Sequence, residues 1–208
     1  MNKVIFQTYQ HFYDRMNHFM EENKTVKECD ICFVGDSIVE MMEVNDFDGR
    51  KCINRGIVSD KSQGVLMTLQ DRVIAIKPKI VYLFIGSNDI CDGYTIAQIE
   101  SNIKDIIMML KENLKDVKII VGTVTPPCYY KADHVDNAYP DCRDILRLKA
   151  LNEKIRNLDN KEENVIVFDV YSLLADENDS LRLDDTLDGV HLTLKAYKVL
   201  KENLKKIL

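Results

Sequence analysis

The stretch IVYLFIGSND at residues 80–89 determines how the rest of the chain is interpreted. Residues 80–85 form a continuous run of branched and aromatic apolar residues, and the glycine and polar residues that come next end it. Such a run is typical of a strand that is buried on both faces of a parallel sheet. The polar residues 87–89 would then lie at the carboxyl end of that strand.

Short apolar runs of this kind alternate with amphipathic segments along the chain. We predict strands over 30–34, 51–54, 80–85, 117–121 and 164–168, and helices over 4–23, 37–42, 60–76, 95–113, 143–158 and 192–207. This alternation predicts an α/β fold in which helices cover both faces of a parallel sheet. Functional residues of such sheets lie beyond the carboxyl ends of the strands.

Length and charge restrict the class of protein. A chain of 208 residues with 46% hydrophobic residues can form one domain, which we place at 1–208 with the helix at about 4–23 packed on it. The net charge of -6 argues against a nucleic-acid partner. We expect no membrane insertion, because no apolar run approaches the roughly 18 residues of a span. Without a secretory leader pattern we expect a cytoplasmic protein, and the aromatic stripe of the first helix could support a homodimer.

The cysteines give no sign of a catalytic or metal-binding role. Of the six, Cys29 and Cys32 have the CxxC spacing, but Cys32 leads into an apolar strand rather than a helix. We interpret this pair as small buried hydrophobic residues of a reduced protein.

Four short polar blocks are the strongest functional signal: GDS at 35–37, NRGI at 54–57, GSND at 86–89 and DGVHL at 188–192. The first three directly follow predicted strands, so one sheet edge would gather them. The fourth precedes the last predicted helix and can fold back to that edge. In their identity and order the blocks resemble those of the SGNH hydrolases, also called the GDSL esterase-lipase family, and in particular its members similar to platelet-activating-factor acetylhydrolase.

The resemblance implies a three-layer α/β/α sandwich with a five-stranded parallel sheet in the flavodoxin-like order 2-1-3-4-5. It also implies hydrolysis of acyl esters with no metal and no cofactor. Ser37 would be the nucleophile, His191 the general base and then acid, and Asp188 the carboxylate that orients the imidazole. The oxyanion hole would consist of the Ser37 N–H, the Gly56 N–H and the Asn88 side-chain amide.

Two further carboxylates belong to the same blocks, and the chain departs from the family pattern in two places. We expect Asp36 and Asp89 to support the turns rather than to take part in chemistry. Many relatives have an additional glycine before Asp60, where this chain has Ser59. The pattern GxSxG is absent, which disfavours a standard α/β-hydrolase nucleophile elbow.

Together these features predict a serine esterase that forms an acyl-enzyme and acts on a small-molecule ester. We expect a short acyl group, acetyl in particular, on a polar alcohol such as a carbohydrate, with the polar loop 125–141 facing the substrate. Acyl-lipid, lysophospholipid and thioester substrates are alternatives within the family. Two rival classes are a metallophosphoesterase that uses the aspartates and His191 as ligands, and a non-enzymatic flavodoxin-like binding module.

Overall fold

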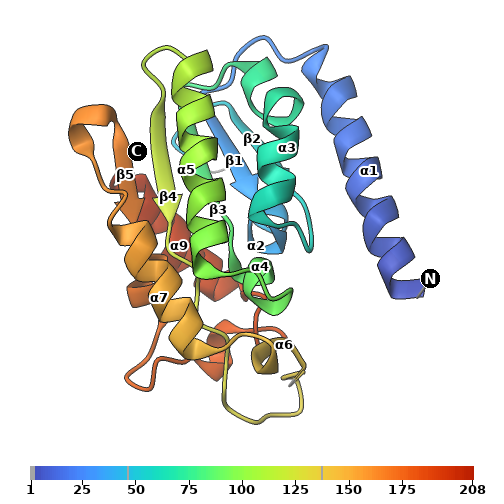
Figure 1. Ribbon diagram of the computed structural model, residues 1–208, viewed down its shortest axis with the longest axis vertical. Coiled ribbons are helices and arrows are strands. Elements are labelled where there is room, and N and C mark those ends of the chain that lie inside the picture. The colour runs from blue at the N-terminus through green and yellow to red at the C-terminus, as the bar shows by residue number, and fades with distance from the viewer. Residues whose placement is uncertain (1–2, 46, 137) are drawn as a thin grey trace.

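The protein is built around one parallel sheet. The computed structural model describes residues 3–45, 47–136 and 138–208, and for residues 3–9 it describes the backbone. The strand order is β2-β1-β3-β4-β5, all parallel, so the predicted order 2-1-3-4-5 is confirmed (Figure 1). The strands are β1 (Ile31–Gly35), β2 (Cys52–Gly56), β3 (Ile80–Phe84), β4 (Lys118–Gly122) and β5 (Val165–Phe168).

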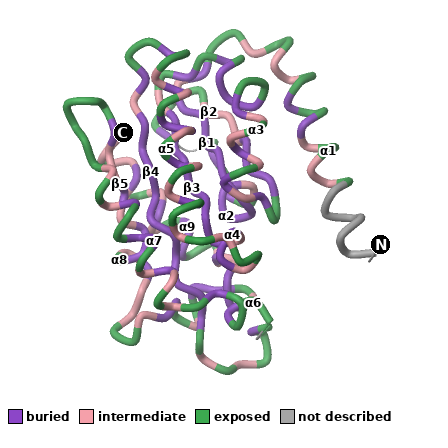
Figure 2. The backbone as a smooth tube through the Cα atoms, in the orientation of Figure 1, coloured by how far each residue is buried: buried purple, intermediate pink, exposed green. Residues whose placement is uncertain are grey.

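Helices cover both faces of this sheet, and the alternation of side chains along each strand divides the core in two. In β1, Cys32 and Val34 pack in one layer, whereas Ile31 and Phe33 pack in the other. The first layer is covered by α3 (Ser62–Arg72), α5 (Ile96–Asn113) and α7 (Ile145–Arg156). The second is covered by α2 (Ser37–Glu40), α8 (Val170–Leu174) and α9 (Leu194–Lys205). The strands between them are largely buried (Figure 2), so the predicted three-layer sandwich is confirmed.

The register brings the carboxyl ends of the central strands level with one another. Gly35, the last residue of β1, pairs with Gly56 of β2 and with Phe84 of β3. A Cβ on residue 35 would lie 2.1 Å from the Phe84 carbonyl oxygen, so this close approach requires glycine. The segments that leave the strands therefore begin side by side at one edge.

Helix α1 (Lys3–Asn23) is present, close to the predicted range, and lies beside α3 at the β2 side of the molecule (Figure 1). Met16 and Phe19 pack on Ile57, directly after β2. Tyr13 is 61% exposed, so the predicted apolar stripe is only partly buried. The aromatic stripe expected on this helix also includes residues 6 and 9, whose side chains lie outside the described part. In the described part of the chain, no helix is both long enough and apolar enough to span a membrane.

Short elements account for most of the differences from the predicted secondary structure. The helix predicted over 60–76 is divided into α3 and a 3-10 turn at Ile74–Ile76, because Val73 leaves the helical conformation with φ −127°. Two further 3-10 turns occur at Lys161–Glu163 and Leu183–Asp185. Apolar periodicity does not predict three short helices, because one helical turn is too short to show a period. They are α4 (Ser87–Cys91), α6 (Ala138–Asp141) and α8.

The expectation of a fully reduced protein is wrong for one pair of cysteines. Cys91, at the end of α4, forms a disulfide with Cys142, which comes directly after α6. The two are 51 positions apart in sequence, and only the packing of α4 near the start of α7 brings them together. Cys29 and Cys32 are free and buried, as interpreted.

Candidate active site

The predicted nucleophile begins α2, directly after the Gly35 turn. Asp36 is the N-cap of this helix, and its carboxylate accepts the Ile38 N–H at 3.0 Å. Tyr197 of α9 donates its hydroxyl to the Ile38 carbonyl at 2.9 Å and so holds α2 from the other side. Burial raises the pKa of Asp36 to about 7, against the opposing effects of the Ile38 hydrogen bond and the Arg143 charge. Asp36 therefore supports the turn that presents Ser37.

The predicted base and its carboxylate lie in a tight turn before α9. Asp188 Oδ1 accepts the backbone N–H groups of Val190 and His191, at 3.0 and 2.9 Å. Its other oxygen, Oδ2, lies 2.6 Å from His191 Nδ1. Burial disfavours the ionised carboxylate, but the hydrogen bonds from the His191 ring and the two N–H groups outweigh it and hold the pKa of Asp188 below its usual value.

The structure brings Ser37, His191 and Asp188 into one hydrogen-bonded series. His191 Nε2 lies 3.0 Å from Ser37 Oγ, although the two residues are 154 positions apart. With Nδ1–H donating to the carboxylate, Nε2 is left as the acceptor for the serine hydroxyl proton. This is the tautomer that a general base for Ser37 needs.

The structure does not support Gly56 as an oxyanion donor. Its backbone N–H donates to the Asn54 side-chain oxygen at 2.8 Å and is therefore occupied. Gly56 instead permits a close approach between β2 and α2, since a Cβ there would lie 2.1 Å from the Glu40 nitrogen. The glycine of this block thus serves packing rather than charge stabilisation.

A free backbone donor lies three residues further on. Ser59 has φ +62°, in the left-handed region, and the Asp60 N–H closes its turn by donating to the Ile57 carbonyl at 3.1 Å. Among the described residues, the Ser59 N–H has no hydrogen-bond partner, and neither has the Ser37 N–H. The sequence signal for this donor is the departure from the family pattern at residue 59, where many relatives have glycine.

The Asn88 amide points into the same turn. Its Nδ2 donates to the Asp60 carbonyl at 3.0 Å, which uses one of the two amide hydrogens, and its Oδ1 accepts from Arg143 at 2.8 Å. Asp89 is fully buried and accepts the Ser62 N–H, which begins α3. Burial raises the pKa of Asp89. Asn88 and Asp89 therefore connect the third block to the turn and the helix start that follow the second block. No sequence motif indicated Arg143.

The long loop after β4 supports the turn that carries Asp188 and His191. The Cys128 N–H donates to the Gly189 carbonyl at 2.7 Å, and the Asp136 N–H donates to the Asp188 carbonyl at 2.9 Å. The Tyr139 ring meets the His191 ring edge-on, with centroids 5.8 Å apart. The loop predicted to face the substrate thus lies against the site and also fixes the position of the imidazole.

The carboxylates required by the metallophosphoesterase alternative are directed at different protein donors. Asp36 binds the Ile38 N–H, Asp89 binds Ser62, and Asp188 binds His191. Within residues 3–45, 47–136 and 138–208, no group of three or more potential ligands gathers in a geometry that could hold a metal ion. The arrangement favours acyl transfer over metal-assisted hydrolysis.

Comparison with known proteins agrees with this geometry. The sequence pattern of the GDSL-like Lipase/Acylhydrolase family matches residues 33–199, which include all four polar blocks. The chain belongs to this family. Its members are carboxylic ester hydrolases, so family membership disfavours the non-enzymatic flavodoxin-like alternative.

Several relatives of this GDSL-like acylhydrolase have names or structures. A stretch of 116 residues is 30% identical to platelet-activating factor acetylhydrolase IB subunit alpha1 of Bos taurus, covering 53% of this chain and 49% of that protein. The chain thus matches about half the length of that relative. Subunit alpha2 of Gallus gallus is 25% identical over 202 residues, covering 92% of this chain and 81% of that protein.

Two solved structures show how far the fold is shared. A protein from Streptococcus pneumonia, provisionally assigned as a platelet activating factor, superimposes with a TM-score of 0.89 at 22% identity over 100% of this chain and 99% of that one. The acetylxylan esterase Axe2 of Geobacillus stearothermophilus has a TM-score of 0.66 at 16% identity, over 87% and 94%. At these identities the likeness concerns the fold alone.

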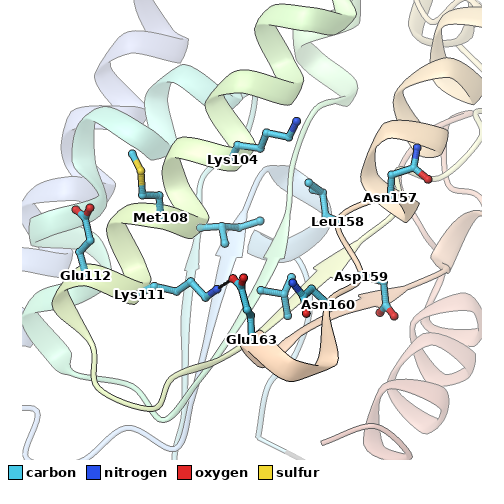
Figure 3. A pocket seen from close by; sticks show the side chains of 11 residues that line it. Lys104, Met108, Lys111, Glu112, Asn157, Leu158, Asp159, Asn160 and Glu163 are labelled. Atoms are coloured by element: carbon cyan, nitrogen blue, oxygen red, sulfur yellow. Dashed lines mark hydrogen bonds and ion pairs between the residues drawn. The ribbon is translucent and has the colours of Figure 1, made fainter.

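A separate pocket lies at the opposite edge of the sheet of this GDSL-like acylhydrolase. It has a volume of about 560 Å³ and is lined by the last turns of α5, by the segment 157–163 that follows α7, and by the start of β5. Lys111 and Glu163 point toward one another across it and form an ion pair (Figure 3). None of the residues that line it belongs to the four polar blocks. The pocket is therefore distinct from the site around Ser37.

Proposed function

We propose that the protein hydrolyses esters through an acyl-enzyme on Ser37, with His191 as base and Asp188 as its orienting carboxylate. The observation that carries the proposal is the continuous series from Ser37 Oγ to His191 Nε2, at 3.0 Å, and from Nδ1 to Asp188 Oδ2, at 2.6 Å. In the first step His191 takes the hydroxyl proton as Oγ attacks the carbonyl carbon. The proton then passes to the leaving alcohol, and water repeats the sequence on the acyl-enzyme.

The negative oxygen of the tetrahedral intermediate needs donors close to Ser37. We propose the Ser37 N–H, the Ser59 N–H and the second hydrogen of Asn88 Nδ2. The two backbone groups have no partner among the described residues, and Asn88 is bonded to Asp60 of the Ser59 turn. Each such donor stabilises the charge that develops in the transition state, and removing one costs roughly 10²–10³ in kcat.

We propose a short acyl group, acetyl first, on a polar alcohol. One relative in sequence supports the acyl part, because it is named an acetylhydrolase. An acetylxylan esterase shares the fold, which is compatible with the same acyl group. The alcohol part is supported by the rim of the site. Tyr139 is 39% exposed and contacts His191, and tyrosine rings bind apolar faces of otherwise polar molecules such as sugars.

The decisive experiment is a substrate panel with the purified chain. p-Nitrophenyl esters of two to sixteen carbons would rank acyl length, and acetylated xylo-oligosaccharides and an acetylated ether phospholipid would rank the alcohol. We expect the acetyl ester to have the highest kcat/KM, with Ser37→Ala and His191→Ala inactive and folded. A fluorophosphonate should label Ser37, as identified by mass spectrometry. Wild-type turnover by Ser37→Ala would contradict the mechanism, and a preference for long chains would contradict the acetyl assignment.

A further inference from the structure

Arg143 is a buried cation that contacts the site but belongs to none of the four polar blocks. It precedes α7 and is 6% exposed. Its guanidinium reaches back to the first turn of α4, where Nε donates to Ser87 Oγ at 2.7 Å and Nη2 donates to Asn88 Oδ1 at 2.8 Å. Nη1 donates to the Tyr139 carbonyl at 2.7 Å. All three nitrogens are thus directed by specific acceptors.

This contact determines the orientation of the Asn88 carboxamide. With Oδ1 facing the guanidinium, Nδ2 faces the Asp60 carbonyl and keeps one hydrogen free. A flipped amide would place its NH₂ against the guanidinium donors and its oxygen against the Asp60 carbonyl oxygen. Both contacts would be repulsive, so Arg143 and Asp60 together permit a single orientation.

The segments on both sides of this contact are joined covalently. Cys91 ends α4, the helix that carries Asn88, and its disulfide partner Cys142 immediately precedes Arg143. The Arg143 carbonyl also accepts the Tyr129 hydroxyl at 2.7 Å. The segment that carries the guanidinium is therefore held in place by the disulfide and by the Tyr129 hydrogen bond.

We propose that Arg143 is a positioning residue for ester hydrolysis, which holds Asn88 Nδ2 toward the developing oxyanion. This inference rests on the proposed function. The planar fork of arginine bonds Ser87 and Asn88 at the same time, whereas lysine is a single point donor. Without Arg143, Asn88 would keep only the Asp60 contact, so the orientation of its amide would be less restricted. The loss should appear in kcat, because the contact is used in the transition state, while substrate binding changes little.

The test is a double-mutant cycle with a matched control. Arg143→Ala should lower kcat about 10–100-fold with KM within about threefold, and Arg143→Lys should recover part of it. In the Asn88→Ala background, Arg143→Ala should change kcat less than about threefold. The control is Arg147→Ala: Arg147 lies one turn further along α7 and donates to the Ile90 carbonyl at 3.1 Å. It joins the same two helices and touches no proposed site residue, so its kcat should stay within about twofold.

The outcomes separate this inference from the proposed function. Suppose that Ser37→Ala abolishes turnover but that Arg143→Ala lowers kcat equally in the wild type and in the Asn88→Ala variant. The proposed function then stands, and Arg143 does not act through Asn88. An equal loss in Arg147→Ala would also overturn the inference, because it would reduce Arg143 to helix packing. If Ser37→Ala is as active as wild type, the proposed function fails first. Should Arg143→Ala not fold, Arg143→Lys completes the same cycle, and full wild-type kcat in that variant overturns the inference.

Discussion

Replacing Asp188 with asparagine tests the tautomer on which the mechanism depends. The carboxylate has two separate tasks, because Oδ1 accepts two backbone N–H groups and Oδ2 accepts the ring N–H of His191. Asparagine keeps one oxygen for the backbone groups, so the turn should survive. Its NH₂ group would then face Nδ1, which can accept that hydrogen bond only when the proton has moved to Nε2. In that tautomer, His191 cannot take the proton of Ser37.

Two contributions to the transition state are lost in Asp188→Asn. The charge-assisted hydrogen bond to the ring contributes about 1.5–3 kcal/mol, and the carboxylate no longer stabilises the imidazolium that forms during attack. In serine hydrolases of this arrangement, the same substitution lowers kcat about 10⁴-fold. The 2.6 Å contact and the half-buried setting of Asp188 lead us to expect a loss of about 10³–10⁴, or about 4–5.5 kcal/mol.

The assay is the steady-state hydrolysis of p-nitrophenyl acetate by the full chain, with thermal unfolding recorded for every variant. Asp184→Asn is the matched control, because Asp184 is exposed in the same segment and loses the same charge. We expect it to keep wild-type kcat within about twofold. If Asp188→Asn stays folded and retains more than a tenth of the wild-type kcat, Asp188 does not set the tautomer and the reasoning is refuted.

Three further predictions concern the surroundings of the site. Burial raises the pKa of the folded Asp36 carboxyl to about 7, whereas the ordinary value for aspartate is 3.8. The free energy of unfolding of the wild type should therefore fall by up to about 4 kcal/mol as the pH rises through this window. In chemical denaturation, Asp36→Asn should remove this pH dependence. Ser59→Gly keeps the backbone N–H and removes the cost of a left-handed serine, so we expect wild-type kcat and about 0.5 kcal/mol more stability. Gly56→Ala should lower the free energy of unfolding in urea by about 3 kcal/mol, because its Cβ would collide with α2. Unchanged stability in both variants would refute this account of the turn. The Cys91–Cys142 disulfide closes a long loop and so restricts the unfolded chain. Its removal by Cys91→Ser should lower the free energy of unfolding by about 4 kcal/mol and the Tm by about 10 °C. An equal Tm of the wild type with and without reductant would refute a stabilising role of this disulfide.

The sequence predicted the parallel sheet and the edge at which its polar segments gather for one shared reason. Parallel strands buried on both faces must be apolar throughout, so their ends are visible as abrupt changes to glycine and polar residues. Level strand ends then gather the polar segments that leave them, as the pairing of Gly35 with Gly56 and Phe84 shows. That argument placed Ser37 and Asn88 at this edge, whereas the strand order and the roles of these residues and of Asp188 and His191 came from the resemblance to the GDSL family.

The resemblance implied Gly56 as an oxyanion donor, but among the described residues the structure leaves a later backbone N–H free instead. Gly56 is the last residue of β2, and its glycine is needed for the approach of α2. The free N–H lies three residues later, where Ser59 adopts a conformation that glycine would favour. Apart from the departure from the family pattern at this position, serine gives no signal for a left-handed turn, so the free N–H becomes evident only in the three-dimensional structure.

Arg143 and the Cys91–Cys142 pair could not be predicted for a different reason. Both depend on the packing of the α6–α7 corner against α4, which joins segments about 50 positions apart in sequence. No periodicity or motif links such segments, and a lone arginine before a helix is most often a solvated surface residue. Its significance comes from burial, because a guanidinium removed from water must have its donors satisfied.

Helix α1 also supports the turn that carries Ser59, although none of the predicted site residues lies on this helix. Glu40 at the end of α2 accepts the Val58 N–H at 2.6 Å, in the turn that carries Ser59, and it is held from α1 by His11 at 3.0 Å and by Arg15 at 3.6 Å. Arg15 also donates to the Gly56 carbonyl at 3.0 Å. The backbone of this turn is thus anchored from two sides, by Asn88 through Asp60 and by α1 through Glu40. The proposed donor at Ser59 must not move as charge develops, and anchoring from a helix at the margin of the fold would help to hold it in place.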